Sequence, residues 1–239
     1  MDEAQILADR LRLVRESIAR ACARSGRDPA TVTLLPVTKG FPAETVYLAM
    51  ALGLAEFGEN RVQEAEEKIA VVDPRPRWHL VGHLQRNKAR RALRLFDVIH
   101  SIDSVEIAGE LSRGAGDAAK KVRGLVEVNT SGDQGKFGVP PDRALELLRA
   151  VRGLDCLDLG GLMTIGPLAG GERGARRAFQ DLAAIRREAA RLEILGEDAD
   201  LSMGMSDDFE VAIEEGATII RLGTALFGAR PAKPGEPAA

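Results

Sequence analysis

Residues 31–52, TVTLLPVTKGFPAETVYLAMAL, contain the alternation on which the fold prediction rests. Thr31–Val37 is a short apolar run rich in β-branched residues, which predicts a buried strand. A helical stretch follows from about Pro42 to Leu52, because proline suits the first turn of a helix and Gly53 suits a helix C-terminus. The stretch therefore predicts one strand followed by one helix.

The same alternation continues along the chain. Residues 3–24 come first and predict a leading helix, because Leu7, Leu11, Val14, Ile18 and Cys22 recur at helical spacing. Seven further strand candidates lie at 56–58, 78–81, 98–101, 125–129, 157–164, 199–203 and 218–222, and the helical stretches lie at 61–71, 86–95, 104–119, 141–151, 173–195 and 208–214.

Strands that alternate with helices imply parallel pairing and right-handed crossovers. Eight such units after one leading helix favour a (β/α)8 TIM barrel, and an open doubly wound sheet is the alternative. We expect a single barrel domain over residues 1–230. Residues 229–239, ARPAKPGEPAA, lack large apolar side chains, so we expect a flexible C-terminal tail over 231–239.

Composition excludes several classes of protein. The 239 residues carry 33 basic and 36 acidic side chains, so no bulk positive charge suggests general nucleic-acid binding. Two cysteines cannot form a disulfide framework. No apolar run reaches the length of a membrane span, and the N-terminus lacks the apolar stretch of a signal peptide. We therefore expect a cytoplasmic protein that does not enter a membrane.

Functional residues of such barrels lie at the C-terminal ends of the strands. Lys39 follows the first strand candidate. Lysines in such places form imines with carbonyl compounds, because desolvation lowers their pKa. The alternative is a lysine that already reaches solvent at the rim of the barrel.

The loops after the seventh and eighth strand candidates suit a phosphate group. Ser206 follows the seventh, and Gly223 and Thr224 follow the eighth, where barrels often bind phosphate with hydroxyl and backbone N–H groups. Ordinary turn and helix-cap chemistry is the alternative for each loop alone. Together with Lys39 and Arg221, these residues indicate a ligand with both a carbonyl and a phosphate. Pyridoxal 5′-phosphate is the leading candidate, and a sugar phosphate in an aldolase-type imine is the competitor.

Several long motifs carry a family resemblance. They are Leu35–Lys39 (LPVTK), Phe57–Glu64 (FGENRVQE), Trp78–Lys88 (WHLVGHLQRNK), Gly161–Ile165 (GLMTI), Leu201–Asp208 (LSMGMSDD) and Ile220–Gly228 (IRLGTALFG). In this order, over about residues 5–230, the chain resembles the pyridoxal phosphate homeostasis protein family. The resemblance implies a barrel like the N-terminal domain of alanine racemase, without that enzyme's second β domain.

The resemblance also implies roles for individual residues. Lys39 would carry the cofactor as an internal aldimine, and Arg221 would face the pyridine nitrogen. The phosphate would be held by Ser206, Gly223 and Thr224, and Asn60 and His83 would lie near the ring or the pocket wall. The implied function is to hold pyridoxal phosphate and supply it to other proteins, among them apo-enzymes that require it, with effects on amino-acid and keto-acid balance. No catalytic residue and no metal are expected.

An amino-acid racemase of the alanine racemase type is the alternative function. Enzymes that use the ring as an electron sink keep its pyridine nitrogen protonated with a carboxylate partner. An arginine is always charged and cannot accept a proton, so Arg221 would leave that nitrogen unprotonated. Two-base racemisation also needs a base opposite the lysine, which alanine racemase takes from a tyrosine of its β domain. The one tyrosine here, Tyr47, falls in the first predicted crossover helix. We expect a monomer, because the β domain supplies much of the racemase dimer contact.

Three other features have ordinary interpretations. His79 and His83 are four residues apart, but they lie in and after a strand candidate, so no metal site is expected. Lys136 is a second lysine candidate, and its glycine-rich surroundings (130–138) predict a mobile, exposed loop. The basic stretch 86–94 is expected to be a solvated face. A second interpretation is that it attracts anionic or coenzyme-receiving proteins.

Overall fold

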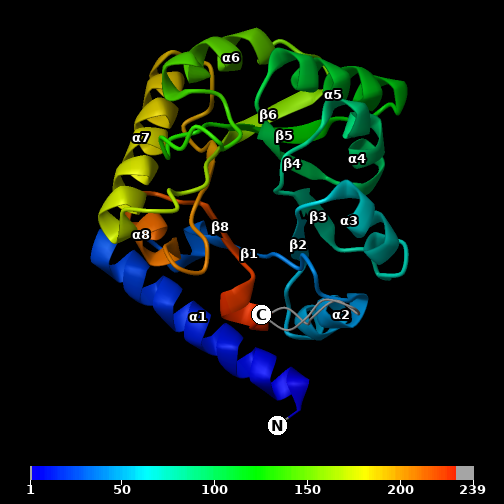
Figure 1. Ribbon diagram of the computed structural model, residues 1–239, viewed down its shortest axis with the longest axis vertical. Coiled ribbons are helices and arrows are strands. Elements are labelled where there is room, and N and C mark those ends of the chain that lie inside the picture. Colours follow the sequence, from blue (N-terminus) through cyan, green and yellow to red (C-terminus); the bar gives the residue numbers. More distant parts are fainter. Residues whose placement is uncertain (1, 230–239) are drawn as a thin grey trace.

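The computed structural model describes residues 2–229, and its centre is a ring of eight parallel strands surrounded by helices (Figure 1). The strands are β1 (Thr33–Pro36), β2 (Glu56–Glu59), β3 (Arg77–Leu80), β4 (Val98–Ile102), β5 (Val122–Glu127), β6 (Leu157–Met163), β7 (Asp200–Ser202) and β8 (Ile219–Leu222). The helices are α1 (Glu3–Ser25), α2 (Ala43–Ala51), α3 (Val62–Ile69), α4 (Ala89–Leu95), α5 (Val105–Asp117), α6 (Ala144–Val151), α7 (Gly171–Arg191), α8 (Phe209–Glu214) and α9 (Thr224–Phe227).

The sheet closes on itself. Its strand order is β1-β8-β7-β6-β5-β4-β3-β2, and a parallel bridge between Val37 and Gly58 joins β1 to β2. The Thr38 N–H donates to the Gly58 carbonyl across the same junction, at 3.0 Å. The predicted (β/α)8 TIM barrel with a leading helix is therefore confirmed. The expected tail, 231–239, lies outside the described residues.

Successive strand residues point to opposite faces of the sheet, and this divides the core into two layers. Outward-facing residues such as Phe57 and Trp78 pack under the helices in one large apolar cluster. Inside the barrel the apolar side chains form two small clusters: Leu35, Val81 and Ile219 in one, and Val98, Leu125 and Met163 in the other. Buried polar side chains, among them His79, His100, Ser202 and Arg221, occupy other interior positions.

The leading helix α1 runs along one side of the barrel beside α8 (Figure 1). Its predicted apolar stripe is buried, including Cys22. Arg24 near its C-terminus pairs with Glu210 and Glu214 of α8, at 2.8 and 2.6 Å. Within residues 2–229, no helix combines the length and apolar character needed to cross a bilayer.

Candidate functional site

A cavity of about 320 Å³ opens at the C-terminal ends of the strands. Its volume is at the lower end of the range for small-molecule pockets. Its walls come from the segments after β1, β2, β3, β6, β7 and β8, together with β8 itself. They are Val37, Lys39, Phe41, Asn60, Val81, Ile165, Met205, Ser206, Asp207, Arg221, Gly223 and Thr224. The structure thus brings together all of the predicted site residues except His83.

Lys39 is half-buried, and the residue before it is held from the outer side of the barrel. The Thr38 carbonyl accepts a hydrogen bond from Lys68 Nζ at 2.7 Å, and the Thr38 hydroxyl donates to Glu59 Oε1 at 2.6 Å. Gly40, the next residue, donates its N–H to Glu64. The backbone on both sides of Lys39 is therefore fixed by β2 and α3.

The Glu59–Lys68 ion pair behind Lys39 is almost completely buried, with 0% and 5% of the two side chains exposed. Burial raises the pKa of Glu59, while the Lys68 charge and the hydrogen bonds from Lys68 and Thr38 oppose that rise. Removing one partner of such a pair leaves an uncompensated buried charge. The pair is therefore a structural support for the loop that carries Lys39.

Arg221 on β8 forms part of the cavity wall from inside the barrel and is 5% exposed. Its Nη1 donates to Ser202 Oγ and its Nη2 to the Thr164 carbonyl, both at 2.7 Å. Burial lowers its pKa to about 10, against the opposing effect of Asp208 and Glu127. The guanidinium therefore stays protonated at neutral pH and acts as a fixed donor.

The loops after β7 and β8 are joined by one hydrogen bond. The Ser206 hydroxyl accepts from the Ala225 N–H at 3.1 Å, at the start of α9. Ser206 is not the N-cap of the following helix, because α8 begins at Phe209 and Asp208 takes the cap position. A Cβ added to Gly223 would lie 3.3 Å from the Val37 carbonyl oxygen. Hydroxyl and N–H donors of both loops thus gather at one side of the cavity, and this arrangement suits a phosphate.

Asn60 and His83 lie at the edge of the cavity. Asn60 borders both this cavity and a wider neighbouring cleft of about 1060 Å³, while His83 borders only the cleft. The His83 ring stacks on Phe137, with centroids 3.6 Å apart, and its Nδ1 lies 3.5 Å from Asp103 Oδ2. His83 therefore sits beside the cavity and not in its wall.

The loop that carries Lys136 is exposed at Gly132, Gln134, Gly135 and Phe137, as expected, but Lys136 itself is largely covered. Only 17% of the Lys136 side chain is exposed, and its Nζ contacts Asp133 Oδ2 at 2.8 Å and the Gly166 carbonyl. The Asn129 side chain also contacts the loop, because its Nδ2 donates to the Asp133 carbonyl at 2.9 Å. These contacts cover the Lys136 amine, and Lys136 is not in the cavity wall.

The basic stretch 86–94 makes surface ion pairs. Arg86 pairs with Glu110 at 3.1 Å, and Arg91 pairs with Glu66. Such pairs agree with the expected solvated face.

Sequence reasoning missed three polar residues of the barrel interior: Glu127, His100 and Ser202. All three are buried. Burial raises the pKa of Glu127 to about 7, the Asp103 charge adds to the rise, and Arg221 opposes it. The alternation of side chains within a strand could have revealed Glu127. Residues two apart in a strand lie on the same face, so Glu127 shares its face of β5 with the interior residue Leu125.

Comparisons with known proteins agree with the geometry. The family model described as alanine racemase, N-terminal domain, matches residues 14–231. The pyridoxal phosphate homeostasis protein of Pseudomonas aeruginosa is 44% identical over 226 residues, which cover 94% of this chain and 96% of that one. The protein of the same name from Aquifex aeolicus is 41% identical over 223 residues, which cover 93% and 97%.

Solved structures give the same result. PipY of Synechococcus elongatus with PLP bound has a TM-score of 0.78 and 36% identity, over 89% of this chain and 100% of that chain. An alanine racemase of Clostridium difficile has a TM-score of 0.71 and 15% identity, over 94% of this chain and 57% of that chain, and shares the fold. By the family model and by these relatives, the chain belongs to the pyridoxal phosphate homeostasis protein family, whose barrel is that of the alanine racemase N-terminal domain.

Proposed function

We propose that this chain binds pyridoxal 5′-phosphate in the cavity at the mouth of its barrel and holds it for supply to other proteins. The observation that carries the proposal is the convergence of an amine, a buried guanidinium and hydroxyl donors on one cavity of about 320 Å³. A relative at 36% identity binds this cofactor, which favours it over a sugar phosphate.

The residues present fit the group at each of its polar ends. Lys39 would bond through Nζ to the aldehyde carbon, with loss of water. The hydroxyls of Ser206 and Thr224, with the backbone beside Gly223, would hold the phosphate through charge-assisted hydrogen bonds. Arg221 would face the ring nitrogen as a donor, since a protonated guanidinium has no acceptor.

Bound pyridoxal phosphate supplies a conjugated ring that can accept electrons, and enzymes that use it so place a carboxylate at the ring nitrogen. In this chain, Arg221 is the group proposed to face the ring nitrogen, in place of a carboxylate. Tyr47, the one tyrosine, lies on α2 and donates its hydroxyl proton to the Val71 carbonyl at 2.6 Å, so it does not serve as a base in the cavity. We therefore propose storage and transfer of the cofactor without turnover of an amino acid.

Borohydride reduction followed by peptide mapping tests the covalent link. The full chain is mixed with pyridoxal phosphate and reduced, and the pyridoxyl group should be found on Lys39. Lys39→Ala should lose the absorbance of the imine, while its circular dichroism stays that of a folded barrel. Lys136→Ala is the matched control and should keep the imine absorbance. Label found mainly on Lys136 would contradict the assignment.

A second measurement tests the absence of turnover. The loaded protein is incubated with single L-amino acids in heavy water, and the D-enantiomer is followed by chiral chromatography. We expect no steady production. Racemisation at the median enzyme pace of about 10 per second would establish the racemase instead.

A further inference from the structure

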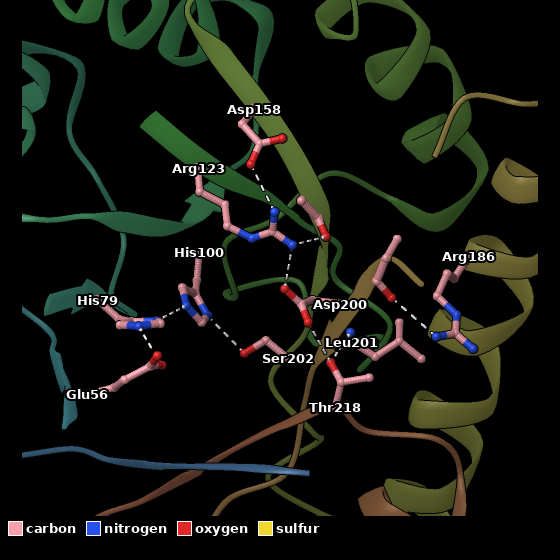
Figure 2. A network of polar contacts seen from close by, with 12 residues as sticks. Glu56, His79, His100, Arg123, Asp158, Arg186, Asp200, Leu201, Ser202 and Thr218 are labelled. Atoms are coloured by element: carbon pink, nitrogen blue, oxygen red, sulfur yellow. Dashed lines mark hydrogen bonds and ion pairs between the residues drawn. The ribbon is translucent and has the colours of Figure 1, made fainter. Parts of the chain in front are cut away.

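A row of polar side chains crosses the inside of the barrel and ends at the cavity. Figure 2 shows four members of the row, Glu56, His79, His100 and Ser202, which follow one another across the view. The contacts are Glu56 Oε2 to His79 Nε2 at 3.1 Å, His79 Nδ1 to His100 Nε2 at 2.9 Å, and His100 Nδ1 to Ser202 Oγ at 2.9 Å. Arg221 Nη1 adds the last contact, on Ser202 Oγ at 2.7 Å. We call these five residues the interior chain.

The interior chain is buried along nearly all of its length. His79 is 2% exposed, and His100 and Ser202 are 0% exposed. Buried polar groups cost free energy unless their donors and acceptors are satisfied, and a row of them is tolerated only when every member finds a partner. The positions of the protons along the row are therefore constrained.

The direction of the hydrogen bonds follows from the cavity end. Arginine has donors and no acceptor, so Ser202 must accept from Arg221. The Ser202 hydroxyl proton is then available only for its other neighbour, His100 Nδ1. A neutral His100 therefore carries its proton on Nε2 and donates it to His79 Nδ1. His79 in turn carries its proton on Nε2, which faces the Glu56 carboxylate.

The Glu56 end of the interior chain gives the same direction of hydrogen-bond donation. Glu56 Oε2 lies 3.1 Å from His79 Nε2, and the interaction with His79 lowers the pKa of Glu56, so its carboxylate stays ionised and presents an acceptor to that nitrogen. Burial lowers the pKa of His100 well below its ordinary value, with smaller contributions from His79, Arg221 and Arg123. A donor at the Arg221 end and an acceptor at the Glu56 end thus agree on one arrangement of the protons between them.

The charged groups around the lower opening of the barrel do not disturb this arrangement. The opening is bordered by Arg77, Asp97, Lys121, Arg123, Asp158 and Asp200. Arg123 is paired with Asp158 and Asp200, both at 2.9 Å, and Arg77 lies 3.4 Å from Glu56. Protonation of His79 would reverse the chain, because His79 Nδ1 would then donate. The Ser202 proton would be left without an acceptor among the contacts of its oxygen in residues 2–229.

We propose that His100 and Ser202 are positioning residues for Arg221, because His100 fixes the Ser202 hydroxyl and the Ser202 oxygen accepts from the guanidinium. The guanidinium is thereby held in place at the cavity wall, and because arginine only donates, the ligand atom opposite it must be an acceptor. The proposal deepens the proposed function, since that atom would be the ring nitrogen of pyridoxal phosphate.

The first test needs no cofactor, so its result is independent of the proposed function. The chain has three histidines, and His83→Asn identifies the signals of the other two. Nitrogen-15 NMR of the imidazole rings in the full chain at neutral pH should show both His79 and His100 as neutral, with the proton on Nε2. A proton on Nδ1 of His100, or a doubly protonated His100, would overturn the proposal.

The second test uses a matched pair of variants. In His100→Asn the side-chain oxygen can take the place of Nδ1 and accept from Ser202, whereas His100→Gln reaches the level of Nε2 and loses that link. We expect His100→Asn to bind pyridoxal phosphate nearly as the wild type does. His100→Gln should bind up to about tenfold more weakly, as for loss of one hydrogen bond between neutral groups.

A merely structural role would give a different pattern. An analogue in which CH replaces the ring nitrogen should bind the wild type and both variants alike, since Arg221 has no acceptor to meet. Equal weakening by Asn and Gln, or equal weakening of both probes, would overturn the positioning role. If the wild type binds neither probe, the proposed function fails while the NMR result still decides the direction of the chain.

Discussion

Glu127→Gln should make the protein without cofactor more stable, and increasingly so as the pH rises. Glu127 ends β5 inside the barrel and is 4% exposed. Its Oε2 is buried and has no hydrogen-bond partner in the described part of the chain. Burial, with the Asp103 charge adding to it and Arg221 opposing it, raises the pKa from 4.5 to about 7.

The size of the effect follows from the shift in pKa. Because the folded state holds this proton more tightly than the unfolded state, folding stability falls as the pH rises from about 4.5 to about 7. At about 1.4 kcal/mol per unit, the full shift corresponds to a loss of about 3 kcal/mol, and the deep burial of Glu127 calls for no discount for solvent screening. Glutamine keeps the shape of the side chain and cannot ionise, so the variant escapes this loss.

Urea unfolding followed by circular dichroism checks this prediction. The free energy of unfolding of Glu127→Gln minus that of the wild type should grow by roughly 2–3 kcal/mol between about pH 5 and pH 9. Glu197→Gln, at an exposed glutamate, is the control and should show a constant difference. A pH-independent difference for Glu127→Gln would refute the reasoning, because it would mean that Glu127 is ionised and satisfied in the folded state.

Three further variants test the supports and the donors of the cavity. Lys68→Met should lower the free energy of unfolding in urea by about 3–5 kcal/mol, because it leaves Glu59 buried without its partner. Lys121→Met, at an exposed lysine, is the control and should lower it little; equal losses would contradict this prediction. Ser206→Ala should weaken pyridoxal phosphate about 10- to 150-fold by absorbance titration and leave pyridoxal without phosphate unchanged. Equal weakening of both ligands would show that Ser206 only joins the two loops. Gly223→Val should weaken pyridoxal phosphate at least as much as Ser206→Ala, because its side chain would crowd the proposed phosphate position; its Cβ would also lie 3.3 Å from the Val37 carbonyl oxygen. Unchanged binding would contradict that phosphate position.

The order of the strands and helices could be predicted because each strand is a short apolar run between helical stretches. Element boundaries were less accurate. The first strand was predicted over 31–37 and observed over Thr33–Pro36, because Pro29–Thr31 forms a 3-10 turn capped by the Asp28 side chain. Helix α9 was not predicted, since four residues are too few to show helical periodicity.

The predicted site residues gather in one cavity because parallel strands end at the same edge of a barrel. His83 could not be placed in this way. Its position depends on stacking against Phe137, which belongs to a loop after a different strand. The contacts of the interior chain could not be predicted either, although each of its members occupies an interior position of its own strand. These contacts depend on which residues face one another across the barrel, and a single sequence does not contain that information.

The two polar supports of the cavity lie on opposite faces of the same strands. Glu59 points outward from β2 to Lys68 and fixes the backbone before Lys39, whereas Ser202 points inward from β7 and fixes Arg221. The two supports share no contact among the described residues. Because each strand residue serves one face only, a barrel can hold the amine through its helical layer and the guanidinium through its interior. The backbone beside Lys39 and the position of Arg221 are in this way set independently, which suits the proposed binding of one ligand at two separate points.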